Sequence, residues 1–155
     1  MMHKRIKGRE FVGVTIVFMC HDGNGNIVMM KRSQNARDEK GKWDIGGGSL
    51  EFGDTVINTL KREIKEEYST DILNFDFLGY RDVHRKDEDG PSHWIALDFL
   101  VLLDKDKVKI GEPDKFTDLK WFRFGKFPQD THSQFPVFLD THKHKLQEVF
   151  GGASN

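Results

Sequence analysis

Three glutamates at helical spacing are the residues of this chain that could most directly do chemistry. Glu63, Glu66 and Glu67 stand at i, i+3 and i+4, which are neighbouring positions on the surface of a helix. Like charges at this spacing destabilise a helix by about 0.2–0.5 kcal/mol per pair. A divalent cation would replace the repulsion by coordination, and Mg²⁺ prefers hard oxygen ligands such as carboxylates. The pattern indicates a metal site acting on a phosphate compound, whereas an isolated acidic run is usually a solvated helix face.

A glycine-rich segment lies at a fixed distance before these carboxylates. Gly46, Gly47 and Gly48 predict a turn whose backbone can adopt conformations closed to other residues and can approach a ligand closely. Three glycines alone are more often a flexible turn, but their distance from the carboxylates favours a substrate-binding role. Lys31 and Arg32 end a predicted strand and could bind phosphate. Solvated surface charge is an equally good interpretation of that pair.

Residues 43–70 resemble the Nudix box of the MutT-like hydrolases in residue types and spacing. The family pattern reads G-x5-E-x7-R-E-U-x-E-E-x-G-U, in which U is a bulky aliphatic residue. Its long fixed spacings make such a match far more specific than a glycine motif alone. The matching residues are Gly48, Arg62, Glu63, Ile64, Glu66 and Glu67.

Three residues depart from the family pattern. Asp54 replaces the first glutamate and is one methylene shorter, so it could cap the helix or reach the metal. Ser69 replaces the late glycine at the predicted helix end. A left-handed backbone there would strain a serine by roughly 1 kcal/mol or more. Thr70 replaces the final aliphatic residue.

The resemblance implies an α/β fold, a Nudix-type α/β/α sandwich around a mixed sheet, in one domain spanning residues 1–155. It implies Mg²⁺ (or Mn²⁺) as cofactor, with Glu63, Glu66 and Glu67 as metal ligands and catalytic residues. Glu63 would also help to activate water, and Arg62 would hold a carboxylate by a bidentate contact. Glu112 lies in a segment that resembles the E-P-x-K of family members acting on nucleoside triphosphates. It would be a further metal ligand or an exposed loop residue.

The resemblance also implies metal-dependent hydrolysis of a diphosphate linkage in a nucleoside diphosphate derivative. A nucleoside triphosphate or its oxidised form, giving nucleoside monophosphate and pyrophosphate, is the first expectation. ADP-ribose or a nucleotide sugar is the alternative substrate. A Nudix-like regulator that binds a nucleotide without turnover is the alternative from another class of protein, left open by Asp54 and Ser69.

Composition limits the partners and the compartment. The 155 residues are 37% hydrophobic and 32% charged, which fits a folded globular domain. A net charge of −1 argues against binding a nucleic-acid polymer, so the expected partner is a small nucleotide, with a homodimer left open. Cys20 is the single cysteine and is expected in the core of a protein from a reducing compartment. With neither a membrane span nor a signal peptide expected, we predict a cytoplasmic protein.

Hydrophobic patterning predicts the elements that position these residues. Residues 10–19 and 26–30 are expected to form a hairpin of two strands, and residues 33–42 a surface loop. The clearest helix covers residues 55–68, with an apolar face beside the carboxylates. Further strands are predicted at 72–81, 93–103, 107–110 and 119–124, with a loop at 86–91. A helix over 136–150, stopped by Gly151 or Gly152, ends the chain.

The histidines predict little chemistry. Seven of them are scattered along the chain without metal-ligand spacing, so no zinc site is expected. His142 and His144 alternate with lysines on the predicted terminal helix, where we expect them to be solvated.

Overall fold

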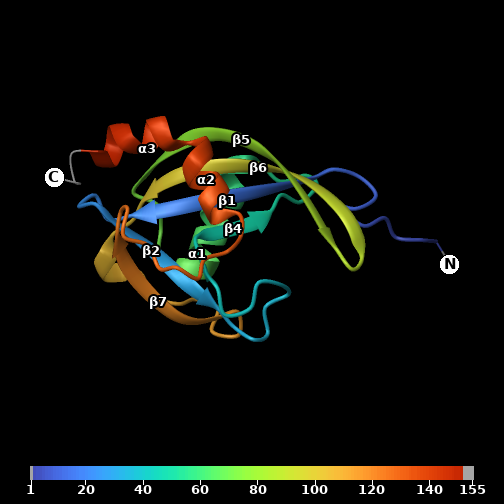
Figure 1. Ribbon diagram of the computed structural model, residues 1–155, viewed down its shortest axis with the longest axis horizontal. Helices are drawn as coiled ribbons and strands as arrows, with labels where there is room; N and C mark the ends of the chain where they lie inside the picture. Colours follow the sequence, from blue (N-terminus) through green and yellow to red (C-terminus); the bar gives the residue numbers. More distant parts are fainter. Residues whose placement is uncertain (1, 152–155) are drawn as a thin grey trace.

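A seven-stranded mixed sheet forms the centre of the computed structural model, which describes residues 2–151 (Figure 1). Hydrogen-bonded neighbours follow the order β3-β2-β1-β6-β5, while β4 pairs with β1 and β7 pairs with β2. The strands are β1 (Gly13–His21), β2 (Asn26–Arg32), β3 (Trp43–Asp44), β4 (Gly46–Ser49), β5 (Asn74–Asp87), β6 (Gly90–Leu102) and β7 (Phe116–Arg123).

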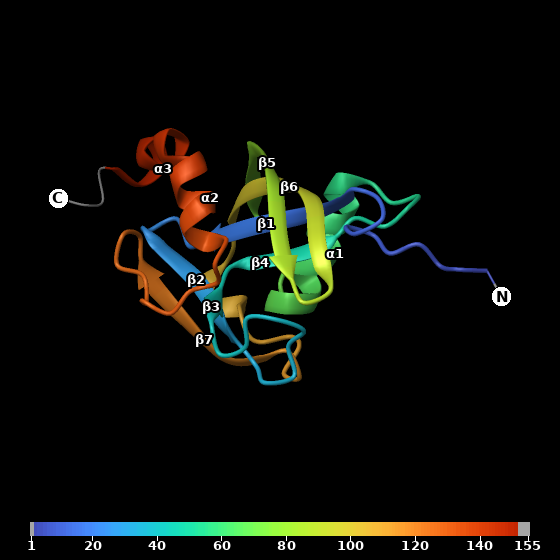
Figure 2. The same ribbon diagram turned by 45° about the vertical axis from the view of Figure 1, so that its right-hand side comes forward.

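Helices cover both faces of the sheet. On one face, α1 (Val56–Tyr68) packs Leu60, Ile64 and Tyr68 into an apolar cluster with strand residues. On the other face, α2 (Phe135–Thr141) and α3 (Lys143–Phe150) contribute to a second cluster (Figure 2). The predicted α/β/α sandwich is therefore confirmed. The predicted helix over 55–68 is confirmed to within one residue.

The central strand β1 joins the two ends of the sheet. Its hairpin with β2 is confirmed, but the register pairs only Cys20 with Val28 and His21 with Ile27. On one side β1 pairs in parallel with β6 along its whole length, and on the other side it pairs antiparallel with β4 before reaching β2. Cys20 is fully buried there, as predicted. Strand β4 therefore pairs with β1 and also contacts α1, the helix that carries the carboxylates.

The glycines predicted as a turn form strand β4 instead. None of Gly46, Gly47 and Gly48 has a positive φ, so special backbone conformations are not the reason for glycine here. The reason is close approach. A Cβ at Gly46 would lie 1.9 Å from the Phe18 ring, and one at Gly48 would lie 2.2 Å from the carboxyl carbon of Glu63. The strand thus needs glycine to fit between the core and the carboxylates.

The hairpin of β5 and β6 is longer than the sequence predicted. The loop expected at 86–91 is wrong, because the ladder continues to the pair Asp87 and Gly90. Charged side chains suit a strand that projects into solvent, and Gly90 takes φ +101° at the tight turn. The strand expected at 107–110 is also wrong. A short 3₁₀ helix, Lys105–Lys107, and irregular backbone occupy that region, whereas the strand predicted at 119–124 is confirmed as β7.

The helix predicted over 136–150 is broken at His142. The residue has φ −108° and ψ 16°, and it separates α2 from α3. Gly151 follows α3, whereas Gly152 and the predicted domain ends at 1 and 155 lie outside the described residues. Among the helices that the structure describes, none is long and apolar enough to cross a membrane.

Candidate active site

Local hydrogen bonds fix the start of helix α1. Thr55 is the N-cap, and its hydroxyl accepts the N–H of Asn58 at 3.1 Å. Asp54 instead pairs with the guanidinium of Arg62 and accepts the hydroxyl of Thr59 at 3.0 Å. The predicted capping role of Asp54 thus belongs to Thr55, while Asp54 is an ion-pair partner at the first turn of α1.

The end of α1 carries the strain expected from the family comparison. Ser69 has φ +61°, a left-handed backbone in which its N–H donates to the carbonyl of Lys65. Glycine takes this conformation without a Cβ penalty, so serine there destabilises the helix end. Chemistry at the carboxylates does not depend on it.

The predicted carboxylates differ sharply in exposure. Glu67 is only 5% exposed and accepts one hydrogen bond, from the N–H of Gly47 at 3.2 Å. Glu63 is partly buried and fits its carboxylate into the space that Gly48 leaves open. Glu66 faces solvent. Strand β4 therefore holds the two inner carboxylates with its backbone.

The fourth predicted ligand, Glu112, comes from a loop that packs against the end of α1. The N–H of Gly111 donates to the carbonyl of Glu67 at 2.9 Å, and this contact brings the next residue to the site. Nζ of Lys115 lies 3.1 Å from Oε2 of Glu112. The negative charge of Glu112 contributes to raising the pKa of both Glu63 and Glu67, so the structure brings this residue together with the glutamates of α1.

Negative charge is poorly balanced at the inner carboxylates. Burial raises the pKa of Glu67 well above its usual range, and the charges of Glu63, Asp44 and Glu112 raise it further. Burial, followed by the charge of Glu66, raises the pKa of Glu63. Arg62 and Lys115 offset only part of this repulsion, and a hard divalent cation stabilises such a set of oxygen donors. These residues fit a bound Mg²⁺ or Mn²⁺.

Arg62 neutralises this group only in part, through a charge that lowers the pKa of Glu63. Its guanidinium is bound to Asp54, and its nearest approach to Glu63 is 3.8 Å. The contact raises the pKa of Arg62 and lowers that of Asp54. Arg62 therefore holds a carboxylate, as its predicted role requires. That carboxylate is mainly Asp54, the residue that differs from the family pattern.

A cavity of about 310 Å³ reaches Glu67 from the face of the sheet that α2 covers. Asp44 and the glycines of β4 line its inner end, and strands β1, β5 and β6 form its floor. Phe135 and Phe138 of α2 form an apolar wall. Its volume lies at the lower end of the range for small-molecule sites, which run from about 300 to 1,000 Å³.

The two predicted basic residues have different positions. Arg32 lines the cavity, where it donates to Asp38 at 2.7 Å and to Asp44 at 3.3 Å. Lys31 is not among the residues that line it. Phosphate binding by Lys31 thus has no support from the shape of the cavity, while Arg32 lies within reach of a bound molecule.

Sequence reasoning missed several residues of the cavity. Asp44 is partly buried, and desolvation raises its pKa next to Glu67. Arg81, Val83 and Arg85 line the floor because alternate residues of a strand share a face. Their spacing of two was a usable signal, but the predicted strand ended at Arg81 and so left out Val83 and Arg85, whereas β5 continues to Asp87.

The expectation that His142 is solvated is wrong. Its side chain is buried, and Nε2 lies 2.6 Å from Oδ2 of Asp98 on β6. Arg81 donates to the same carboxylate from Nε at 2.6 Å and from Nη2 at 3.1 Å. The buried carboxylate explains the broken terminal helix, because the imidazole must turn inward to meet it. His144 is exposed, as predicted.

Comparison with known proteins decides the family. The model of the NUDIX domain matches residues 10–140, which is most of the chain. The chain belongs to the Nudix family. The Nudix box runs from strand β4 through α1, and its carboxylates are those of Glu63, Glu66 and Glu67. Nudix hydrolases act on small nucleotides and generally use divalent metal ions, so this chain is a Nudix hydrolase with a pyrophosphohydrolase site.

Individual Nudix relatives support the same fold and family. The nucleoside triphosphatase NudI of Salmonella arizonae is 27% identical over 121 residues, covering 73% of this chain and 84% of NudI. The crystal structure of a MutT Nudix hydrolase from Burkholderia pseudomallei matches with a TM-score of 0.72 at 26% identity, covering 85% of this chain and 98% of that one. The Nudix domain of Shewanella oneidensis NrtR, solved with ADP ribose, shares the fold with a TM-score of 0.64 at 16% identity, covering 87% of each chain.

Proposed function

We propose that this Nudix hydrolase cleaves a nucleoside triphosphate, ordinary or oxidised, into a nucleoside monophosphate and pyrophosphate. The observation that carries the proposal is the cavity that ends at Glu67. A base and sugar would occupy its floor, and the phosphates would extend past the glycine strand toward the carboxylates. The similarity to NudI, a nucleoside triphosphatase, supports a triphosphate over other nucleotides.

Glu63, Glu66, Glu67 and Glu112 would hold the Mg²⁺ or Mn²⁺ ion. When bound, the ion supplies positive charge that neutralises phosphate oxygens and orients the substrate. Glu63 would accept a proton from the attacking water, the role that the Nudix resemblance gives it. Its carboxylate is held between Gly48 and the side of Arg62, which fixes it for that transfer.

Other residues of the chain would bind and orient the nucleotide. The N–H of Gly47 donates to Glu67, so the backbone of β4 would orient this carboxylate and would also lie beside the bound nucleotide. Arg32 lies at the cavity beside Asp44 and would meet a phosphate or a polar edge of the base. The apolar wall of Phe135 and Phe138 would exclude water from the base.

We also propose a cytoplasmic setting for the enzyme. The single cysteine, which permits no internal disulfide, supports a reducing compartment.

The test is pyrophosphate and phosphate release over a panel of nucleotides with Mg²⁺. The panel contains the common and oxidised nucleoside triphosphates, ADP-ribose and nucleotide sugars, and the Glu67→Gln variant controls for contaminating phosphatases. We expect pyrophosphate from at least one triphosphate and none from the variant. Turnover of ADP-ribose or a nucleotide sugar alone would replace the proposed substrate. Binding without turnover across the panel would make the chain a regulator instead of an enzyme.

A further inference from the structure

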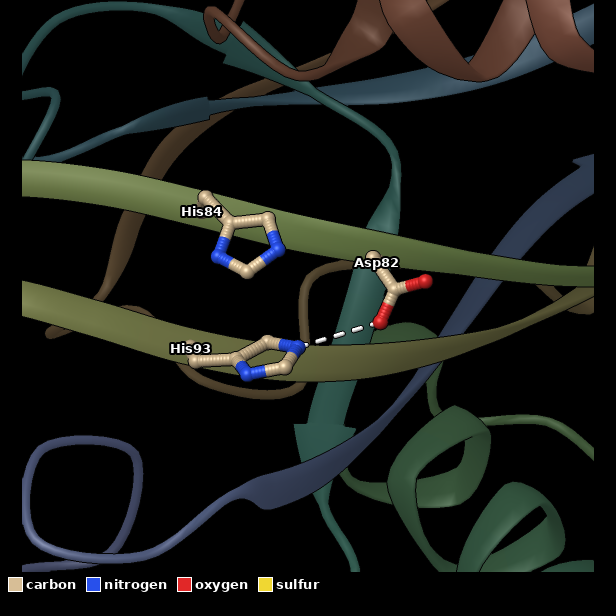
Figure 3. A group of neighbouring side chains, drawn as sticks. All are labelled: Asp82, His84 and His93. Carbon is tan, nitrogen blue, oxygen red and sulfur yellow. Dashed lines mark hydrogen bonds and ion pairs between the residues drawn. The ribbon is translucent and has the colours of Figure 1, made fainter.

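The hairpin of β5 and β6 gathers two histidines and an aspartate on one face. Asp82 and His84 are two residues apart on β5, so both project from the same side of the strand. The antiparallel register places His93 of β6 directly opposite His84. Figure 3 shows the three side chains meeting across the two strands. Arg81 and Arg85, at the alternate positions of β5, line the cavity on the other face.

The distances between these three groups suit a small cation. One donor atom from each residue lies within 4.8 Å of the other two. Nε2 of His93 is 3.0 Å from Oδ1 of Asp82, and the two imidazole rings stack with centroids 4.1 Å apart. A tetrahedral ion with bonds of about 2.0–2.1 Å holds its donors roughly 3.3–3.4 Å apart. Small rotations of partly exposed side chains would bring all three donors to that spacing.

The types of donor atom in this cluster determine which metal ion it prefers. Two imidazoles and one carboxylate suit zinc and its neighbours in the transition series, whereas Mg²⁺ prefers an all-oxygen set. A surface ion pair needs only His93 and Asp82. The third donor, from His84, is what a metal site requires and an ion pair does not. Water would fill the remaining position of an ion held by three protein ligands.

The ligands stand on a rigid scaffold. The ladder between β5 and β6 runs without a break from the pair of Gly79 and Asp98 to the turn beyond Asp87. Sites built on strands hold their geometry better than sites on loops. An ion here would tie the edge strand β5 to β6, behind the stretch that carries Arg81 and Arg85 into the cavity.

We propose that Asp82, His84 and His93 bind one divalent transition-metal ion, with Zn²⁺ as the preferred occupant, at a site separate from the carboxylates of α1. The sequence concealed this site because its ligands come from two strands and meet only through their register. Binding would stabilise the folded chain, since an ion that binds the native state alone raises its stability by mass action. The nucleotide takes no part in this site, so the proposed Zn²⁺ binding is independent of the proposed function.

The test is Zn²⁺ binding to the full chain, measured by competition with a chromogenic chelator in excess Mg²⁺. The wild-type protein and the Glu67→Gln variant are expected to bind one Zn²⁺ per chain with equal affinity. His84→Ala and His93→Ala are each expected to weaken binding at least tenfold, in proportion to a lost ligand. His144→Ala removes an exposed histidine on α3 and is the matched control, with no expected change.

Two further measurements keep the outcome decisive. Circular dichroism is expected to show that the exposed substitutions leave the fold intact, and Zn²⁺ is expected to raise the melting temperature of the wild type but not of His84→Ala. Nuclear magnetic resonance is expected to show Zn²⁺ shifting the ring signals of His84 and His93. Unchanged affinity in both alanine variants, loss of the ion in Glu67→Gln, or absence of binding at micromolar Zn²⁺ would each overturn the proposal.

Discussion

Two buried carboxylates of this protein have opposite surroundings. Asp98 is fully buried, yet Arg81 and His142 contact it with three short bonds. Glu67 is nearly as buried but accepts a single hydrogen bond from the protein, and the charges of other carboxylates raise its pKa. A buried charge is stable when it is paired and hydrogen-bonded, and costly otherwise.

The difference separates a structural carboxylate from one that we propose binds the metal. Asp98 has all the partners it needs, and it joins β5 and β6 to the junction of α2 and α3. Among the described residues no cationic side chain pairs with Glu67, and under the proposed function a cation from solution would be its partner.

The Asp98→Asn variant tests the structural carboxylate. Removing the charge leaves Arg81 buried without its ionic partner, and breaking a buried pair destabilises by about 3–5 kcal/mol. Urea unfolding followed by circular dichroism measures the loss. Asp76→Asn, an exposed position on the same hairpin, is the control and should change stability by less than about 0.5 kcal/mol. Equal stability of the two variants would contradict the structural role.

The Glu67→Gln variant should behave in the opposite way. Its activity should fall by roughly 10²–10³-fold, the usual loss when one group that stabilises charge in a site is removed. The metal-free variant should nevertheless be more stable than the wild type at neutral pH, since the amide removes an unbalanced buried charge. Melting in EDTA and steady-state kinetics in Mg²⁺ measure the two effects. A variant that is both inactive and less stable would make Glu67 a second structural carboxylate.

The Gly48→Ala variant tests how the glycine strand positions Glu63. A Cβ would come within 2.2 Å of the carboxyl carbon of Glu63, so this side chain must move. Displacement by about 1 Å can cost up to 10²-fold in rate, and we expect a loss of kcat between tenfold and 10²-fold. Gly151→Ala is the control, because its nearest neighbour would be 4.0 Å away. Full activity in Gly48→Ala would show that Glu63 needs no fixed position.

The pH dependence of stability gives the smallest of these effects. Since the folded pKa of Glu67 is raised above the usual 4.5, ionisation opposes folding. Its favourable contribution is fully present below about 4.5 and is lost as the pH rises through the raised value. In EDTA, the wild type should therefore lose stability relative to Glu67→Gln across that window, and Mg²⁺ should reduce the difference. If the stabilities of the wild type and Glu67→Gln changed in parallel across this pH range, the charge of Glu67 would not destabilise the fold.

The features that could be predicted from the sequence are those set by residues close together in the chain. The box residues from Gly48 to Glu67 lie on one strand and one helix, so their spacing translates directly into proximity. Helix α1 followed from its apolar period, and the left-handed Ser69 followed from a missing glycine. Burial of Cys20 followed from the apolar run around it.

Long-range pairing explains what the sequence could not predict. Asp98, Arg81 and His142 come from three elements far apart in the chain, and only the folded register brings them together. The broken terminal helix depends on that contact, so helical periodicity alone predicted one helix. Asp44 belongs to the site because β3 ends beside β4. Local hydrophobic patterning does not predict this short strand.

One measurement tests the contrast between the two carboxylates most directly: anomalous diffraction from crystals grown with Mn²⁺. We expect a manganese peak within coordination distance of the carboxylates of Glu63 and Glu67, and none at Asp98. A saturated crystal with no peak beside Glu67 would contradict this, because the buried charge of Glu67 would then be stable without a bound ion.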